Sequence, residues 1–130
     1  MKTVVVSGGF DPVHIGHLQL FEEAKKLGDY LIVIVNSDKF LQEKKNFVFM
    51  PLIERKKIIL GFSCVDEVID SIDEDHTVRK TLQKLSSNRK IDIFANGGDR
   101  RNLKDIPEYE ICKKNKIEMV FDVGGGKIQS

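Results

Sequence analysis

The residues best suited to chemistry lie in one segment near the N-terminus, SGGFDPVHIGHL, residues 7–18. Gly8 and Gly9 carry no side chain, so the backbone there can approach a phosphate closely. A helix expected to begin near His14 would direct its unpaired N–H groups and the positive end of its dipole to the same place. His14 and His17 are three residues apart and therefore lie on one face of the first turn. The segment predicts a binding site for a phosphate or a similar anion.

The two imidazoles are the candidate chemical groups of this segment. At the positive end of a helix, both are placed to donate hydrogen bonds to an anion. The helix dipole disfavours the charged imidazolium, so we expect a lowered pKa and neutral donors. A strand-turn-helix unit with two surface histidines and no ligand is the alternative. The combination of paired glycines with both histidines argues against it.

Apolar runs and helical stripes predict the elements that hold this segment in place. Strands are predicted at residues 3–6, 30–35, 67–70, 91–95 and 118–121, the first two as continuous apolar runs typical of strands buried on both faces. Helices are expected at about 14–27, 51–62, 77–85 and 107–114. Gly28 is expected to end the first helix, and Asp75 or Thr77 to cap the third. The polar residues 42–46 are expected to form a loop.

This alternation predicts a single α/β domain over residues 1–130, with a Rossmann-like, five-stranded parallel sheet and helices on both faces. Ligands of such sheets bind outside the carboxyl ends of the strands, where the strand order reverses. We therefore expect the active site at the carboxyl ends of the first and fourth strands.

The composition is that of a globular protein, with 41% hydrophobic residues and a formal net charge of +1. Acidic and basic residues alternate along the chain, unlike the one-sided basic surface of a nucleic-acid binder. No apolar run approaches the roughly 20 residues of a membrane span, and the chain enters a strand without a signal peptide. A cytoplasmic location is expected. Cys64 and Cys112 sit among apolar neighbours and are interpreted as reduced core thiols.

Three stretches, in order along nearly the whole chain, resemble a known family. Residues 9–17, GFDPVHIGH, resemble the signature of the cytidylyltransferase-like nucleotidyltransferases, and 14–17 spell their HIGH box. Residues 54–60 with 65–68 resemble the ERxxxL…VDxV block of glycerol-3-phosphate cytidylyltransferases, which also occurs in heptose-phosphate adenylyltransferases. Residues 91–99, IDIFANGGD, resemble the strand and the GGD or GDD turn of both groups.

The resemblance implies roles for particular residues. In the family the glycine turn and both histidines hold the triphosphate, and the histidines stabilise the α-phosphate as it becomes pentacoordinate. The implied nucleotide contacts are Gly8, Gly9, Phe10, His14, Gly16, His17, Asp99, Lys127 and Ser130. Asp99 alone would also suit a plain turn.

A lysine after the second strand contacts the β- and γ-phosphates or the acceptor in this family. This implies a catalytic role for Lys44 or Lys45, and the choice between them is open. Lys44, Asp11 and Arg55 are the implied contacts of the acceptor substrate. Arg55 has an alternative role, which is to pair with Glu54 or with a neighbouring subunit.

The C-terminus departs from the family pattern. Relatives carry an Arg-Thr-Glu-Gly-Ile-Ser-Thr string or a similar one, which binds phosphates and opens a final helix. Residues 124–130 here read GGGKIQS, and Lys127 is expected to supply the charge of the missing arginine. We expect the sequence to stop within this motif. A frayed, glycine-rich terminus without function is the alternative.

The implied reaction is in-line attack of an acceptor phosphate oxygen on the α-phosphorus of a nucleoside triphosphate, with release of pyrophosphate. Mg²⁺ is expected to accompany the triphosphate, since this ion keeps several waters and needs no protein cage. The expected partners are the nucleotide, a small phosphorylated acceptor and a second copy of the chain, but neither nucleic acid nor membrane. Residues 47–50 are a candidate dimer contact, or else core.

CTP is the favoured nucleotide because residues 42–45 and 58–68 resemble the glycerol-phosphate group. An adenylyltransferase of heptose-phosphate or flavin type, using ATP, is the first alternative and is suggested by the GGD turn at 97–99. A non-catalytic nucleotide-binding module is disfavoured, because binding alone tolerates the loss of either histidine. A tRNA synthetase is disfavoured because the chain has no KMSKS-like loop.

Overall fold

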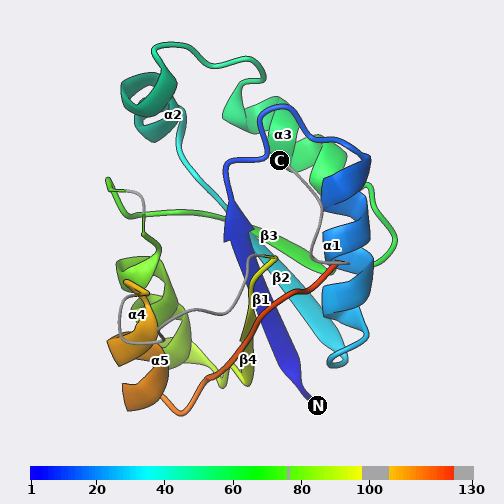
Figure 1. The fold of residues 1–130 in the computed structure, drawn as a ribbon, viewed down its shortest axis with the longest axis vertical. Helices are drawn as coiled ribbons and strands as arrows, with labels where there is room; N and C mark the ends of the chain where they lie inside the picture. The colour runs from blue at the N-terminus through cyan, green and yellow to red at the C-terminus, as the bar shows by residue number, and fades with distance from the viewer. Residues whose placement is uncertain (76, 98–105, 125–130) are drawn as a thin grey trace.

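The computed structural model describes residues 1–75, 77–97 and 106–124. Within them a five-stranded sheet has the order β3-β2-β1-β4-β5, with every neighbouring pair parallel. The strands are β1 Thr3–Gly8, β2 Tyr30–Val35, β3 Glu67–Asp70, β4 Ile93–Ala95 and β5 Glu118–Val120. The predicted Rossmann-like α/β fold is thereby confirmed (Figure 1).

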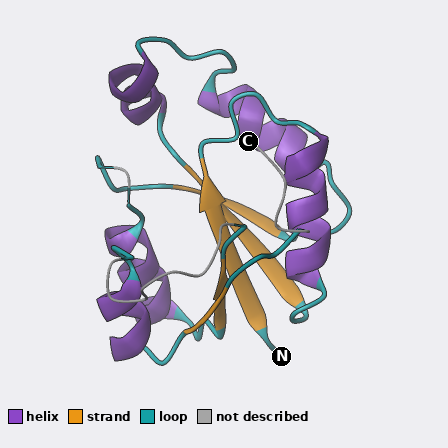
Figure 2. Ribbon diagram, viewed as in Figure 1, coloured by secondary structure: helices purple, strands orange, loops and turns teal. Residues whose placement is uncertain are grey.

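The helices cover both faces of the sheet (Figure 2). They are α1 Ile15–Lys25, α2 Asp38–Lys45, α3 Leu52–Leu60, α4 Arg79–Asn88 and α5 Tyr109–Lys114. Helices α1 and α3 pack on one face through Phe21, Ala24 and Ile59. On the other face α4 and α5 contribute Leu82 and Cys112. Successive side chains of a strand point to opposite faces, so β1 supplies one core with Val4 and Val6 and the other with Val5.

Helix α2 corrects the prediction of a loop at residues 42–46. Ser37 caps the helix, because its hydroxyl accepts a hydrogen bond from the N–H of Phe40 at 3.1 Å. Asn46 ends it in the left-handed conformation at φ 65°. Only Leu41 is buried, so the helix has no apolar stripe to reveal it, although Gln, Glu and Lys are good helix formers.

The N-terminus of α4 also differs from the prediction. It begins at Arg79, and neither Asp75 nor Thr77 caps it. Asp73, which is buried, accepts from the N–H groups of Lys80 and Thr81, and Glu108 accepts from that of Val78. Two of these N–H groups are thus satisfied from the loop before α4 and one from the residue that precedes α5, 30 residues away, so the arrangement does not follow the usual spacing of a helix cap.

Both cysteines are free thiols. Cys112 is buried, and burial together with the nearby charge of Glu108 raises its pKa to about 12. Burial also raises the pKa of the half-buried Cys64. Neither thiol has the low pKa of a reactive cysteine. Separately, none of the described helices is long and apolar enough to cross a bilayer.

Candidate active site

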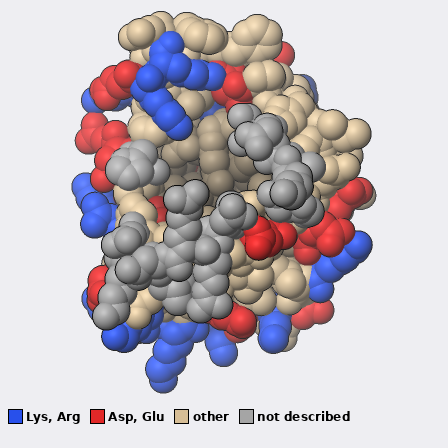
Figure 3. Space-filling view, in the orientation of Figure 1, with Lys and Arg blue, Asp and Glu red and all other residues tan. Residues whose placement is uncertain are grey.

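The strand order reverses between β1 and β4, which is where ligands of open α/β sheets bind. Gly8 ends β1 at this edge, and Asn96 follows β4. The face seen in Figure 3 is hollowed, and Lys and Arg side chains gather over α2 at the upper rim of the hollow.

A cavity of about 240 Å³ lies between the turn after β1, the start of α1 and the end of α2. It is lined by Gly9, Phe10, Asp11, Pro12, His14, His17, Leu41, Lys44 and Lys45. The structure therefore brings the candidate histidines and both candidate lysines to one place, although α2 lies beyond the whole of β2 in the sequence. Leu41 and Pro12 are wall residues that the sequence did not single out.

The histidines form the N-terminal cap of α1. Nδ1 of His14 accepts a hydrogen bond from the N–H of Gly16 at 3.0 Å, and Nδ1 of His17 accepts from the N–H of His14 at 3.1 Å. A neutral imidazole whose Nδ1 accepts carries its proton on Nε2. The capping box thus fixes one tautomer for each ring and leaves each Nε2–H free of the cap.

His17 is buried and stacks on His14 with ring centroids 3.9 Å apart. Burial, with a smaller effect from the neighbouring His14, lowers the pKa of His17 to about 4. The expected direction is confirmed for His17, but the causes differ from the helix dipole on which the expectation rested. At neutral pH this ring is an uncharged Nε2–H donor.

A side chain at either glycine of the turn would press against a neighbouring side chain. A Cβ on Gly8 would lie 2.9 Å from Cζ of Phe10, and one on Gly9 would lie 3.0 Å from Cδ2 of Leu41. Phe10 itself has a φ of 53°, which is uncommon for a non-glycine residue. Its ring packs edge-on against the ring of His17, with centroids 4.9 Å apart, and so helps to hold that histidine in place.

The two lysines differ in their environment. Nζ of Lys45 lies 2.8 Å from Oδ2 of Asp11 and donates to the backbone oxygen of Asp11 at 3.0 Å. Lys44 is exposed, and its ammonium lies 5.7 Å from the centroid of the Phe40 ring. Within the described part of the chain Lys44 makes no ion pair.

Asp11 is among the residues that line the cavity, but its carboxylate is buried, with only 1% of the side chain exposed. Burial alone would raise its pKa; hydrogen bonds from Lys45 and from the N–H groups of Phe49 and Met50 outweigh this, so the pKa lies below its usual range. The predicted contact of Asp11 with substrate stays a prediction.

Arg55 is fully buried and does not line the cavity. Its guanidinium donates to the backbone oxygens of Gly9 and Asn36, each at 2.8 Å, and its Nη2 pairs with Asp38 at 2.7 Å. A fourth bond, from Nε, reaches the carbonyl of Met50. Its ionic partner is therefore Asp38 and not Glu54. In this conformation the guanidinium positions the turn and is covered from any substrate.

Asp38 and Asn36 are site-forming residues that the sequence patterns did not single out. The signal available was their place, directly after a buried strand at the ligand-binding edge. The predicted contacts Asp99, Lys127 and Ser130 lie outside the described residues.

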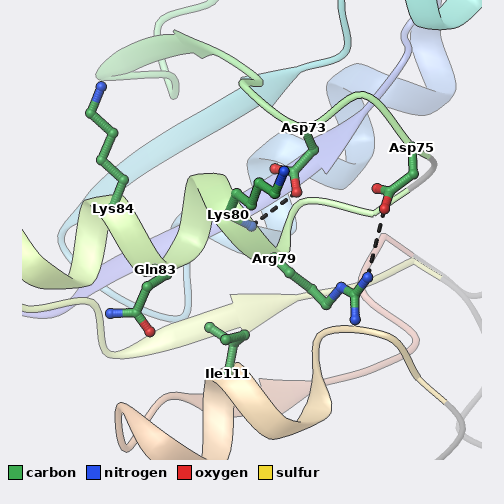
Figure 4. Close-up of a pocket in the computed structure, with 7 residues that line it drawn as sticks. All are labelled: Asp73, Asp75, Arg79, Lys80, Gln83, Lys84 and Ile111. Carbon is green, nitrogen blue, oxygen red and sulfur yellow. Dashed lines mark hydrogen bonds and ion pairs between the residues drawn. The ribbon is translucent and has the colours of Figure 1, made fainter.

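A second cavity, of about 500 Å³, lies between α4, the loop before it and α5 (Figure 4). Its carboxylates interact with other groups of the protein: Asp73 accepts a hydrogen bond from the N–H of Lys80 at 2.9 Å, and Asp75 forms an ion pair with Arg79 at 3.6 Å. None of the predicted site residues lines it. Although this cavity is larger, the chemical groups converge in the one that holds the histidines.

The low pKa of His17 makes folding stability depend on pH. Unfolded His17 binds a proton below its ordinary pKa of 6.5, whereas the folded residue stays neutral to about pH 4. Stability should therefore fall as the pH drops through this window, by up to about 1.4 kcal/mol per pH unit. Urea unfolding at several pH values should show this slope. The slope should be smaller in His17→Gln, which keeps a capping box; equal slopes in the two proteins would refute the assignment.

Comparisons with known proteins agree with this geometry. A family model described as Cytidylyltransferase-like matches residues 5–122. The chain is 38% identical over 121 residues to an FAD synthase of Ferroglobus placidus, covering 92% of this chain and 75% of the relative. It is also 38% identical over 121 residues to a glycerol-3-phosphate cytidylyltransferase of Bacillus subtilis, covering 93% and 85%. A lipopolysaccharide core biosynthesis protein from Thermoplasma volcanium superposes with a TM-score of 0.70 at 26% identity, covering 93% of this chain and 95% of that one. The chain belongs to the cytidylyltransferase-like family of nucleotidyltransferases.

Proposed function

We propose that the protein transfers a nucleoside monophosphate, with CTP as the favoured donor, to the phosphate of a small molecule such as glycerol 3-phosphate. The observation that carries the proposal is the pair of imidazoles at the N-terminus of α1, whose Nδ1 atoms are both held by backbone N–H groups. An Nε2–H donor from each ring is thereby preorganised beside a cavity that two lysines also line.

In the proposed reaction an oxygen of the acceptor phosphate attacks the α-phosphorus in line. The bond from that phosphorus to the bridging oxygen breaks, and pyrophosphate leaves. Charge builds on the non-bridging oxygens of the α-phosphate, where the two Nε2–H donors and the positive end of α1 would stabilise it. Catalysis would thus rest on positioning and on preorganised charge stabilisation, without a covalent enzyme intermediate.

Mg²⁺ is proposed to enter with the triphosphate and to be held by phosphate oxygens and waters. Among the residues that the structure describes, no group of three or more His, Cys, Asp or Glu side chains is placed to hold a metal ion. No step is therefore assigned to a metal held by the protein.

Adenylyl transfer from ATP is the second candidate, because one of the similar relatives is an FAD synthase. The family aspartate near the nucleoside corresponds to Asp99, outside the described residues. The choice between CTP and ATP therefore rests on the assay.

The assay combines each nucleoside triphosphate and Mg²⁺ with glycerol 3-phosphate, a heptose phosphate or flavin mononucleotide, and detects pyrophosphate. We expect turnover with CTP and a phosphorylated acceptor.

His17→Ala should lower kcat about 100-fold or more and change the nucleotide Kd only a few-fold, since the hydrogen bond from His17 to the α-phosphate strengthens in the transition state. His14→Ser, which keeps an N-cap residue, should act similarly. A near-normal kcat in both variants, or nucleotide binding without turnover, would favour a binding module.

Lys44 is proposed as the lysine that contacts phosphate, because Lys45 is already paired with Asp11 whereas Lys44 lines the cavity and has no ion pair among the described residues. Lys44→Met should weaken triphosphate binding about tenfold, as expected for loss of one charge-assisted hydrogen bond. Lys39→Met makes the same change in charge on α2 and should leave binding unaltered. Equal effects of the two variants in nucleotide titrations would show a general effect of charge instead.

A homodimer is also proposed. Three large apolar residues close together in the chain are exposed to solvent: Phe47 by 54%, Phe49 by 66% and Ile53 by 81%. Exposed apolar residues of this kind are typical of a protein–protein interface. The double variant Phe49→Ser, Ile53→Lys should be monomeric by light scattering at micromolar concentration while the wild type is a dimer. Ile72→Ser, at another exposed isoleucine, is the control. A monomeric wild type would refute the proposal.

A further inference from the structure

The carboxylate of Asp11 joins two segments that are far apart in the sequence. Its Oδ2 lies 2.8 Å from Nζ of Lys45, at the end of α2, and accepts from the N–H of Phe49 at 2.8 Å. Its Oδ1 accepts from the N–H of Met50. The turn after β1 is thus fastened to the end of α2 and to the loop that follows it.

Met50 is held from both sides. Its N–H donates to Asp11, and its carbonyl accepts from Nε of Arg55 at 2.8 Å. Arg55 in turn donates to the carbonyl of Gly9, two residues before Asp11. These bonds form a closed loop of contacts that joins the turn after β1 to the segment before α3.

A buried anion is unfavourable beside a site that binds phosphates, because it repels the ligand. Asp11 is nevertheless present, and all the contacts of its carboxylate that the structure shows are internal. Its charge is therefore balanced within the protein, and its effect is to fix the position of Lys45 and of the last turn of α2.

We propose that Asp11 is a positioning residue, which holds the lysines of α2 at the cavity wall in register with His14 and His17. The inference rests on the proposed function. Lys45 acts as the counter-ion that fastens α2, and Lys44, one residue before it, is thereby placed to meet the phosphates. Asp11 itself contacts neither nucleotide nor acceptor.

If Asp11 only positions the lysines, removing its carboxylate should lower the rate of turnover without lowering the affinity for the nucleotide. Asp11→Asn removes a negative charge beside the cavity and releases the ammonium of Lys45 from its ion pair. The stronger electrostatic attraction for a triphosphate then offsets the weaker contact from a displaced Lys44, so affinity is kept or increased. The lysines lose their fixed position, and misplacement of such groups by about 1 Å can cost roughly 100-fold in rate. A direct contact between Asp11 and a ligand would instead reduce affinity when the carboxylate is removed.

The experiment compares wild type with Asp11→Asn, Lys45→Met and Lys45→Arg, with Lys39→Met as the matched control on α2. Single-turnover rates at saturating CTP or ATP and nucleotide titrations are measured, together with hydrogen exchange of the Phe49 and Met50 amides in the ligand-free proteins. For Asp11→Asn we expect a rate about 10- to 100-fold lower, an unchanged or tighter Kd and faster exchange at both amides. Lys45→Met should resemble it in rate, and Lys45→Arg, which keeps the ion pair, should recover most of the rate.

Three results would overturn the inference: a parallel tenfold loss of nucleotide affinity in Asp11→Asn, a wild-type rate in that variant, or unchanged exchange at Phe49 and Met50. Failure of the proposed function is distinct, since it would appear as a wild type that turns over no nucleotide. The amide exchange of the ligand-free proteins reports on the Asp11 contacts in either case.

Discussion

The guanidinium of Arg55 is the interaction on which the rest of the site depends. It is fully buried, yet it lies among three backbone carbonyls and the carboxylate of Asp38. Removing a cation from water is costly unless its donors are satisfied and its charge is paired, and here both conditions are met. Because those carbonyls belong to the turn after β1, the residue after β2 and the loop before α3, one side chain sets the distances between the three segments.

Electrostatic contacts take the place of apolar packing in this region. Helix α2 buries only Leu41, and a short helix with so little apolar contact has marginal stability by itself. It is fastened at its first turn by Asp38 to Arg55 and at its last turn by Lys45 to Asp11. Ion pairs thus position the cavity wall that carries the lysines. The wall that carries the histidines is positioned instead by Phe10, whose ring packs against His17 and against Phe21 of the core.

Much of the fold follows from local pattern. The strands at 30–35 and 67–70 have the predicted bounds, and the spacing of His14 and His17 was enough to predict that the two rings meet at the N-terminus of α1. What remained hidden depends on partners distant in sequence. The difference between Lys44 and Lys45 arises from Asp11, 34 residues away, and the burial of Arg55 arises from carbonyls of other segments. Neither leaves a periodic signal, and α2 has no apolar stripe by which to be found.

The contact between Gly8 and the ring of Phe10 couples the evolution of these two positions. A methyl group at position 8 would lie 2.9 Å from the ring, so alanine fits there only once the residue at position 10 is smaller or displaced. Shrinking that residue first removes the edge-on support of His17. Each single step is therefore unfavourable, even where a double change would pack well. A scan that replaces one residue at a time would therefore assign to Gly8 alone a packing constraint that belongs to both positions.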